Sequence, residues 1–221
     1  MSGVQVTART GSAQTVAYEW LKQHISSLPR TDSVFLSESE IAAVTNTSRT
    51  PVREALLRLE TEGFVQIIPK RGIFVPAISD FEVNAAMEAR QLLEDWCVRQ
   101  SAAVAESLVP ELEKLLKEQA GLADDPGRFI AADRAFHRAI VVQAGNPVVA
   151  GFYESLRERQ VRMGLSALAS EEGRQAAVLD EHRAIVEALR TGDPEAASAS
   201  LRAHLASTLQ TLNRLTSYGR R

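Results

Sequence analysis

The sequence predicts a mainly α-helical protein of two domains. The N-terminal domain is expected to hold three helices and a two-stranded hairpin, and the rest an all-α bundle of about six helices. Two observations lead to this fold class. Apolar residues at helical spacing cover most of the chain, and the β-rich runs are adjacent, at 64–68 and 72–75.

The composition is that of an ordinary globular protein. The 221 residues suffice for two small domains, and 45% are apolar and 24% charged. The single cysteine, Cys97, gives no internal disulfide, and no apolar run approaches the roughly 20 residues of a membrane span. Residues 1–10 lack the apolar core of a signal peptide. A cytoplasmic protein is expected.

The charge is nearly balanced along the chain. A net charge of -3 argues against a protein that coats nucleic acid over its whole surface. Residues 1–78 hold 8 Lys and Arg against 7 Asp and Glu, and the remainder holds 17 against 21. Contact with DNA would therefore depend on local clusters of basic residues.

Three helices are expected in the first domain. Residues 14–28 carry a helical apolar stripe. A short second helix begins after Ser37, with Glu40 at the reciprocal position of a capping box. After a polar turn, Ser48 caps the third helix and Gly63 ends it.

The runs at 64–68 and 72–75 predict a β-hairpin with the basic tip Pro69-Lys70-Arg71. Helix, helix, turn, helix and hairpin, in this order, are the elements of a winged helix-turn-helix. We therefore expect a winged helix-turn-helix domain at 1–76 and a linker at 77–79.

The remainder, residues 80–221, shows helical periodicity without a convincing strand. Its breaks fall at proline and glycine residues, which end helices. The expected helices cover roughly 80–107, 110–122, 127–144, 147–168, 172–191 and 194–217.

The third helix contains candidate DNA-binding residues, because in this motif it enters the major groove by its N-terminus. Arg49 and Arg53 are four residues apart and share a face, so both could bind guanine or phosphate. The hydroxyls of Ser48 and Thr50 suit phosphate oxygens.

Lys70 and Arg71, at the hairpin tip, could reach an adjacent minor groove or the DNA backbone. The alternative is a solvated helix face on which Arg49 and Arg53 pair with Glu54 and nearby acids. The order of cap, turn and basic hairpin favours DNA contact.

Three of the four histidines lie in the helical domain. His137 follows Asp133 by one turn, so both share a helix face, and His182 and His204 lie in two later helices. Three imidazoles and a carboxylate from three helices could bind one divalent cation. Taken singly, each histidine is more often a half-buried packing residue than a ligand.

Residues 36–76 resemble the winged helix of the GntR family of bacterial transcription regulators. The matching positions are Ser48-Arg49-Thr50-Pro51-Val52-Arg53-Glu54-Ala55, Leu59-Glu60, Gly63, Arg71-Gly72 and Val75. The resemblance implies DNA contacts by Arg49, Thr50 and Arg53, and wing contact through Gly72. Members often carry arginine where this chain has Ser39, so the operator sequence cannot be assumed.

Residues 80–215 resemble the FCD domain of the FadR subfamily. The matching positions are Arg90-Gln91-Leu92-Leu93-Glu94, Asp133-Arg134-Ala135-Phe136-His137, Ala144-Gly145-Asn146-Pro147, Glu181-His182-Arg183 and Leu201-Arg202-Ala203-His204. The resemblance implies a divalent metal ion on Asp133 and the three histidines. Zinc is expected, with nickel or manganese as alternatives.

The resemblance also implies an effector pocket. Four protein ligands leave an octahedral ion two open positions, which a small carboxylate could occupy. Arg90 is expected to anchor this anion, or else to form a surface ion pair with Glu94. Asn146 could line the pocket, or cap the helix that starts at Pro147.

The expected function is that of a ligand-responsive transcription regulator and not of an enzyme. A repressor is expected, because repression that a ligand relieves is the more common mode of action in the family. It would bind a pseudo-palindromic operator as a homodimer, because one winged helix reads only a half-site. One alternative is a regulator whose metal is structural or is itself the signal. A metal-dependent enzyme is disfavoured, because no general base stands near the histidines and a fused DNA reader would be unexplained.

Overall fold

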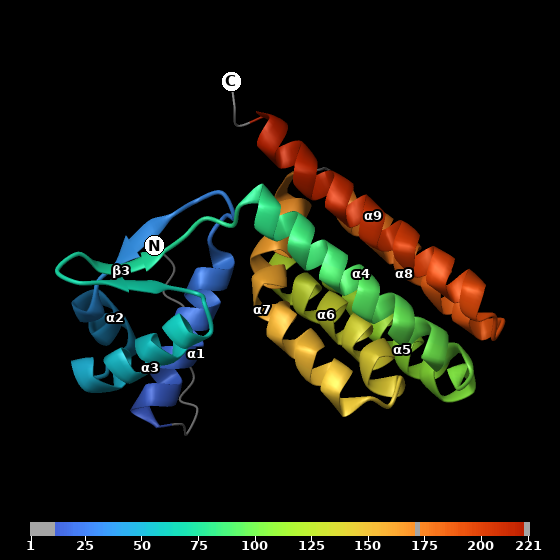
Figure 1. Ribbon diagram of the computed structural model, residues 1–221, viewed down its shortest axis with the longest axis horizontal. Helices are drawn as coiled ribbons and strands as arrows, with labels where there is room; N and C mark the ends of the chain where they lie inside the picture. Colours follow the sequence, from blue (N-terminus) through green and yellow to red (C-terminus); the bar gives the residue numbers. More distant parts are fainter. Residues whose placement is uncertain (1–11, 171–172, 219–221) are drawn as a thin grey trace. The chain divides into compact units, whose positions relative to one another are not determined.

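The computed structural model describes residues 12–170 and 173–218. Residues 1–10, for which no secretion signal is predicted, lie outside this range. The chain divides into two compact units, Met1–Ala77 and Ile78–Arg221 (Figure 1). Each unit has hydrophobic clusters of its own. The model confirms the predicted mainly helical fold class.

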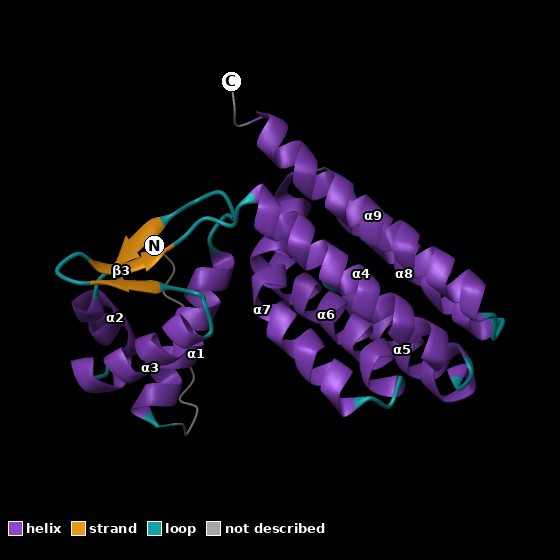
Figure 2. Cartoon of the chain, viewed as in Figure 1, coloured by secondary structure: helices purple, strands orange, loops and turns teal. Residues whose placement is uncertain are grey.

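The first unit packs three helices against a small sheet (Figure 2). The helices are α1 (Ala13–Ser27), α2 (Glu38–Thr45) and α3 (Arg49–Thr61), and the strands are β1 (Val34–Leu36), β2 (Gln66–Ile68) and β3 (Gly72–Val75). The antiparallel sheet has the order β1-β3-β2, with Phe35 opposite Phe74 and Ile67 opposite Ile73. This is a winged helix-turn-helix.

The sheet has one strand more than the sequence analysis predicts. β1 is only three residues long, too short for an alternating pattern to be recognised. The Phe35 ring packs beside the tilted Phe74 ring, with ring centroids 5.0 Å apart, and Val34 and Leu36 pack against the core. The strand therefore depends on a cross-strand contact that is remote in sequence.

The second unit is the predicted helical bundle. Its helices are α4 (Asp80–Ala102), α5 (Ala105–Ala120), α6 (Pro126–Gln143), α7 (Pro147–Ser170), α8 (Arg174–Arg190) and α9 (Pro194–Tyr218). α4 lies beside α9, α5 beside α6 and α8 beside α9 (Figure 1). Their apolar faces bury Phe136, Ile140, Ile185, Leu201 and Leu205 in one cluster.

One helix break differs from the prediction. Pro110 lies inside α5, and the break between α4 and α5 falls at Ala103 and Val104. Ser107 donates a hydrogen bond from its hydroxyl to the Val104 carbonyl, 3.0 Å away, in the first turn of α5. Among the described residues, no helix combines the length and apolarity needed to cross a bilayer.

Candidate functional site

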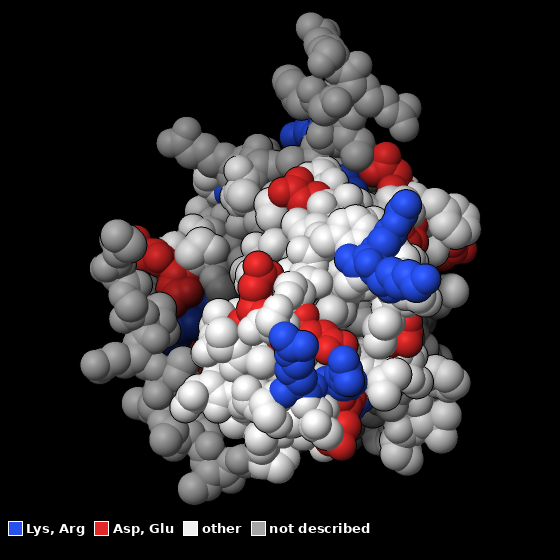
Figure 3. Space-filling model, turned by 90° about the vertical axis from the view of Figure 1, so that its left-hand side faces the viewer, with Lys and Arg blue, Asp and Glu red and all other residues white. Residues whose placement is uncertain are grey.

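The N-terminus of α3 presents the predicted DNA-binding side chains to solvent. Ser48, Arg49, Thr50 and Arg53 are all exposed. Ser48 is the N-cap residue, and its side chain makes no capping hydrogen bond. Basic side chains gather in two groups on this side of the unit, with acidic side chains beside them (Figure 3). The helix end and its hydroxyl are thus open to a phosphate oxygen.

Arg53 is held by an acidic neighbour. Its Nε donates to both carboxylate oxygens of Glu38, at 3.1 Å and 2.8 Å, and the Arg53 side chain remains 63% exposed. Glu38 lies in the first turn of α2. The pair is therefore a solvated contact between the two helices of the motif, and Arg53 remains accessible to DNA.

The wing tip combines two exposed cations with an unusual backbone. Lys70 and Arg71 are exposed, and Lys70 adopts φ 64°. Gly72 has φ 104°, and a Cβ at this position would lie 3.0 Å from the Leu36 carbonyl oxygen. Glycine is required there by the backbone. The wing geometry explains Gly72 without any side-chain contact to DNA.

The bundle brings the four predicted metal ligands together. Asp133 and His137 project from α6, His182 from α8 and His204 from α9, and their candidate ligand atoms all lie within 4.8 Å of one another. The three histidines are buried, with at most 2% exposure, and Asp133 is partly buried. Helices far apart in the sequence thus converge on one point.

The imidazole Nε2 atoms face this point. Nε2 of His137 lies 3.1 Å from Nε2 of His204, and Nε2 of His182 lies 3.4 Å from Oδ1 of Asp133. Two nitrogen ligands at right angles on one ion, each at about 2.1 Å, would be separated by about 3 Å. The spacing suits a shared cation.

Each histidine is held by a different side chain through its Nδ1 atom. Nδ1 of His204 lies 2.7 Å from Oε2 of Glu181, and Nδ1 of His182 lies 2.9 Å from Oε1 of Gln119. Nδ1 of His137 lies 2.7 Å from Oε2 of Glu94. These roles of Glu94, Gln119 and Glu181 were not predicted from the sequence.

Burial and neighbouring charges shift the pKa values of two of the histidines and of Glu94. Burial lowers the pKa of His182 well below its ordinary value, and the neighbouring imidazoles lower it further. Burial also lowers the pKa of His204, although Glu181 opposes the shift. Burial alone would raise the pKa of Glu94, but Arg90 and His137 outweigh it and lower the pKa to about 2.

The donor set fits a divalent first-row metal ion. Nε2 of His182 is buried and makes no hydrogen bond to the described residues, which is costly for a polar atom unless a cation binds it. An acceptor oxygen lies 2.7–2.9 Å from each Nδ1, and protons on the Nδ1 atoms would leave the Nε2 lone pairs of His137 and His204 facing each other. A positive ion between them would relieve this repulsion. Three imidazoles and a carboxylate are typical ligands of such ions.

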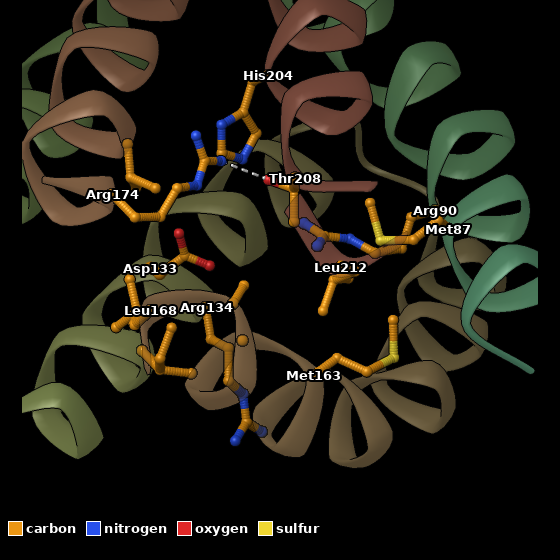
Figure 4. A pocket seen from close by; sticks show the side chains of 14 residues that line it. Met87, Arg90, Asp133, Arg134, Met163, Leu168, Arg174, His204, Thr208 and Leu212 are labelled. Atoms are coloured by element: carbon orange, nitrogen blue, oxygen red, sulfur yellow. Dashed lines mark hydrogen bonds between the residues drawn. The ribbon is translucent and has the colours of Figure 1, made fainter. Parts of the chain in front are cut away.

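A small cavity of about 40 Å³ adjoins these ligands. The Asp133 carboxylate and the Arg90 guanidinium extend into it from α6 and α4 (Figure 4). Its lining combines two of the candidate metal ligands, three arginines and a threonine with apolar side chains. The residues that line it are Met87, Arg90, Ile130, Asp133, Arg134, Met163, Gly164, Ala167, Leu168, Arg174, Val178, His204, Thr208 and Leu212. The cavity holds about three water molecules or a few ligand atoms.

The two predicted ligand-binding residues lie apart. Arg90 lines the cavity and is 6% exposed, and its Nε donates to Oε1 of Glu94 at 2.7 Å. The pair with Glu94 is therefore buried and not on the surface. Asn146 does not line the cavity. Its Oδ1 accepts from the amides of Val148 and Val149 at the start of α7.

The family of the chain follows from comparison with known proteins. The model of the FCD domain matches residues 85–207, more than half of the chain, and the model of bacterial regulatory proteins of the gntR family matches residues 13–75. The chain belongs to the GntR family. Its members carry a DNA-binding helix-turn-helix, so the first unit of this GntR regulator is a DNA-binding domain.

Relatives extend over most of this GntR-family chain. An HTH-type transcriptional regulator in an unstable DNA locus of Streptomyces ambofaciens is 31% identical over 90% of this chain and 84% of its own length. The HTH-type transcriptional repressor RspR of Escherichia coli K12 is 31% identical over 77% of this chain and 75% of its own length. These relatives are transcription regulators and not enzymes.

A solved structure shares the fold. E. coli McbR/YncC superposes with a TM-score of 0.77 at 21% sequence identity, and the match covers 94% of this chain and 100% of that one. At this identity the likeness concerns the fold alone. The prediction of a GntR regulator with an FCD domain is confirmed by the family matches.

Proposed function

We propose that this GntR regulator is a repressor that releases DNA when a small carboxylate binds beside a metal ion in its helical unit. A winged helix-turn-helix of residues 1–76 would read the operator, and residues 80–221, after a linker at 77–79, would sense the ligand. One observation carries the proposal. Asp133 and His204, two members of a four-residue donor set, line the same small cavity as the Arg90 guanidinium.

DNA reading is assigned to α3 and the wing. Arg49 and Arg53 would bind base edges or phosphates, and Ser48 and Thr50 would bind the backbone at the open helix end. Lys70 and Arg71 would contact the flanking groove. Gly72 would shape the wing, as its φ of 104° requires glycine.

Asp133, His137, His182 and His204 would hold the metal, and zinc is the ion that we propose, with nickel or manganese as alternatives. When bound, the ion would supply positive charge and open coordination positions for an anion. The size of the cavity limits the effector to a few non-hydrogen atoms unless side chains move.

Three arginines line the cavity, Arg90, Arg134 and Arg174, and Arg90 is a better carboxylate anchor than Arg174. Arg174 donates through Nη1 to Glu181 and Ser207, and through Nη2 to Glu181 and Thr208, at 2.8–3.1 Å. All four of its Nη hydrogens are therefore engaged. Arg90 uses Nε for Glu94, and neither of its Nη atoms hydrogen-bonds to the described residues. Its Nη groups are free to form a bidentate pair with a carboxylate.

The regulator is expected to act as a homodimer on a pseudo-palindromic operator. One winged helix contacts a single half-site, and two-fold related half-sites match a two-fold protein. The repressor polarity is proposed from RspR, which is named a repressor. Ligand release of DNA then needs a difference in ligand affinity of only a few kcal/mol between the free and DNA-bound states.

The proposal can be tested by binding to a DNA fragment from upstream of the gene. DNA affinity would be measured with and without Zn²⁺ and with a panel of small carboxylates. Release by one acid, lost in His137→Ala and kept in His24→Ala, would support the proposal, because His24 lies in the first unit. Tight DNA binding that no acid and no chelator changes would contradict ligand sensing.

A second candidate function is that of a DNA-binding regulator in which the metal ion is a structural element or is itself the signal. The buried donor set favours it as much as it favours effector sensing. Metal removal separates these roles. A structural ion leaves the bundle unfolded when it is removed, whereas a sensed ion leaves it folded and changes DNA affinity.

A further inference from the structure

We infer that Glu181 and Glu94 are positioning residues, which hold His204 and His137 in the one tautomer that turns Nε2 toward the metal. The inference rests on the proposed function in one respect, namely that a metal binds at these histidines. Neither glutamate touches the proposed metal through its own oxygens. Each would act through the histidine that it contacts.

The contact of Glu181 with His204 fixes the proton of the imidazole. At 2.7 Å, the Glu181 carboxylate oxygen and Nδ1 of His204 need a proton between them. A carboxylate accepts, so the proton sits on Nδ1 and Nε2 keeps its lone pair. Nε2 is the atom that faces the donor set, 3.1 Å from Nε2 of His137.

Glu94 stands in the same relation to His137. Its Oε2 lies 2.7 Å from Nδ1 of His137, and both side chains are almost completely buried. No aligned hydrogen bond joins these two atoms, but at 2.7 Å an ionised carboxylate oxygen would repel a bare nitrogen lone pair, so the proton of His137 is also favoured on Nδ1. The third histidine, His182, has a neutral acceptor in Gln119 and a free Nε2. All three rings therefore favour the same tautomer.

Arginine side chains fix the orientation of both glutamates. Arg174 donates to the two carboxylate oxygens of Glu181 at 2.8 Å and 3.1 Å, and Arg90 donates to Oε1 of Glu94 at 2.7 Å. Each glutamate is thus bound on one side by an arginine and on the other by a histidine. The two arginine–glutamate–histidine chains arrange the ligands before a metal arrives, and this lowers the ordering cost of metal binding.

The test uses Zn²⁺ and the metal-free protein. Zinc affinity would be measured by competition with a chromophoric chelator, and ¹⁵N NMR at pH 8 would report the histidine tautomers without metal. In Glu181→Ala we expect zinc affinity to fall by about 10- to 100-fold and His204 to lose its preference for a proton on Nδ1. In Glu181→Gln and Glu94→Gln, which keep an acceptor as Gln119 does, we expect smaller losses of affinity and an unchanged tautomer.

Glu113→Gln is the matched control. Glu113 pairs with Arg190 on the exposed surface of the same bundle, so its loss should change neither measurement. The inference is overturned if Glu181→Ala binds zinc as tightly as the wild type, or if the wild-type rings carry their protons on Nε2. If the wild type binds no zinc, the metal part of the proposed function fails while the tautomers still decide the inference. If Glu181→Ala does not fold, Glu181→Gln and the wild-type spectrum decide it.

Discussion

In the protein without DNA, Arg53 is paired with an acidic side chain, because the Glu38 carboxylate accepts a hydrogen bond from its Nε. In Glu38→Gln we expect about two- to tenfold tighter binding to DNA of random sequence and a steeper salt dependence. The reason is that one more cation becomes available for phosphate. Titrations at several salt concentrations would measure both quantities.

Glu40→Gln is the control for this change. Glu40 lies in the same first turn of α2 and has no hydrogen bond or ion pair to the described residues. An equal gain in both variants would show that bulk charge, and not the release of Arg53, determines DNA affinity.

Gly72 is a second residue at which the backbone geometry predicts the effect of a substitution on stability. In Gly72→Ala, a methyl group would sit 3.0 Å from the Leu36 carbonyl at φ 104°. We expect the first unit to lose about 1–3 kcal/mol of its free energy of unfolding. Urea unfolding would measure the loss. The control is Gly127→Ala, in the first turn of α6, where the nearest atom to an added methyl group is 3.5 Å away. This change should not lower the free energy of unfolding.

At the scale of residues, the sequence predicted the four metal-ligand candidates but none of the side chains that contact the Nδ1 atoms of the histidines. The spacing of Asp133 and His137 is local, so helical geometry was sufficient. Glu181 precedes His182 in the sequence, yet it contacts His204 on another helix. This contact depends on the rotation of two helices about their axes, which periodicity does not determine. Glu94 was expected only as an ion-pair partner of Arg90, and no pattern in the sequence distinguished Gln119 from other polar residues.

At the scale of helices, α4 and α9 are joined by a polar cluster as well as by apolar packing. The carboxylate of Asp95 accepts from the buried Ser198 hydroxyl and, at 3.1 Å, from Nε of Arg99. Arg99 also donates to Ser198 at 2.8 Å. Burial would raise the pKa of Asp95, but Ser198 and Arg99 outweigh it and lower the pKa.

Because the pKa of Asp95 is lowered, the loss of stability in an Asp95→Asn variant should depend on pH. Stability from the charged form is complete above the unfolded pKa, about 3.9, and is lost as the pH falls through the lower folded value. Asp95→Asn should therefore cost about 1 kcal/mol at pH 7 and less at pH 3.5, because below the unfolded pKa of about 3.9 the wild type has already lost part of the stability that the charged form adds. Urea unfolding at both pH values measures this. Asp180→Asn, on an exposed surface pair, should be neutral at pH 7, and an equal cost there would contradict the argument.

Element boundaries were predictable where a single residue decides them. Ser79 forms the complete capping box of α4 with Glu82, and Asp125 caps α6 just before Pro126. The capping box predicted for Ser37 and Glu40 does not form, because the Ser37 hydroxyl lies 2.6 Å from that of Ser39 instead. β1 was not predicted at all, since its pairing partner lies about forty residues away.

For the molecule as a whole, the hydrophobic clusters of the first unit and of the bundle share no described residue, and this predicts that metal acts on one unit. A ligand that binds only the folded state adds about 2.7 kcal/mol of stability at a hundredfold excess over its Kd. The proposed metal ligands all lie in α6, α8 and α9, and no described side chain of the first unit belongs to the donor set. The added stability should therefore appear in the bundle alone.

Hydrogen exchange with and without Zn²⁺ tests this prediction. Slower exchange is expected across the cores of α6, α8 and α9, where local opening would break the donor set, and unchanged exchange is expected in α1 and α3. His182→Ala removes one ligand and should abolish the zinc effect, whereas His24→Ala in α1 should preserve it. Equal protection of both units in the absence of DNA would mean that they unfold as one cooperative body, and a sensor in which only the bundle responds directly to metal would then be untenable.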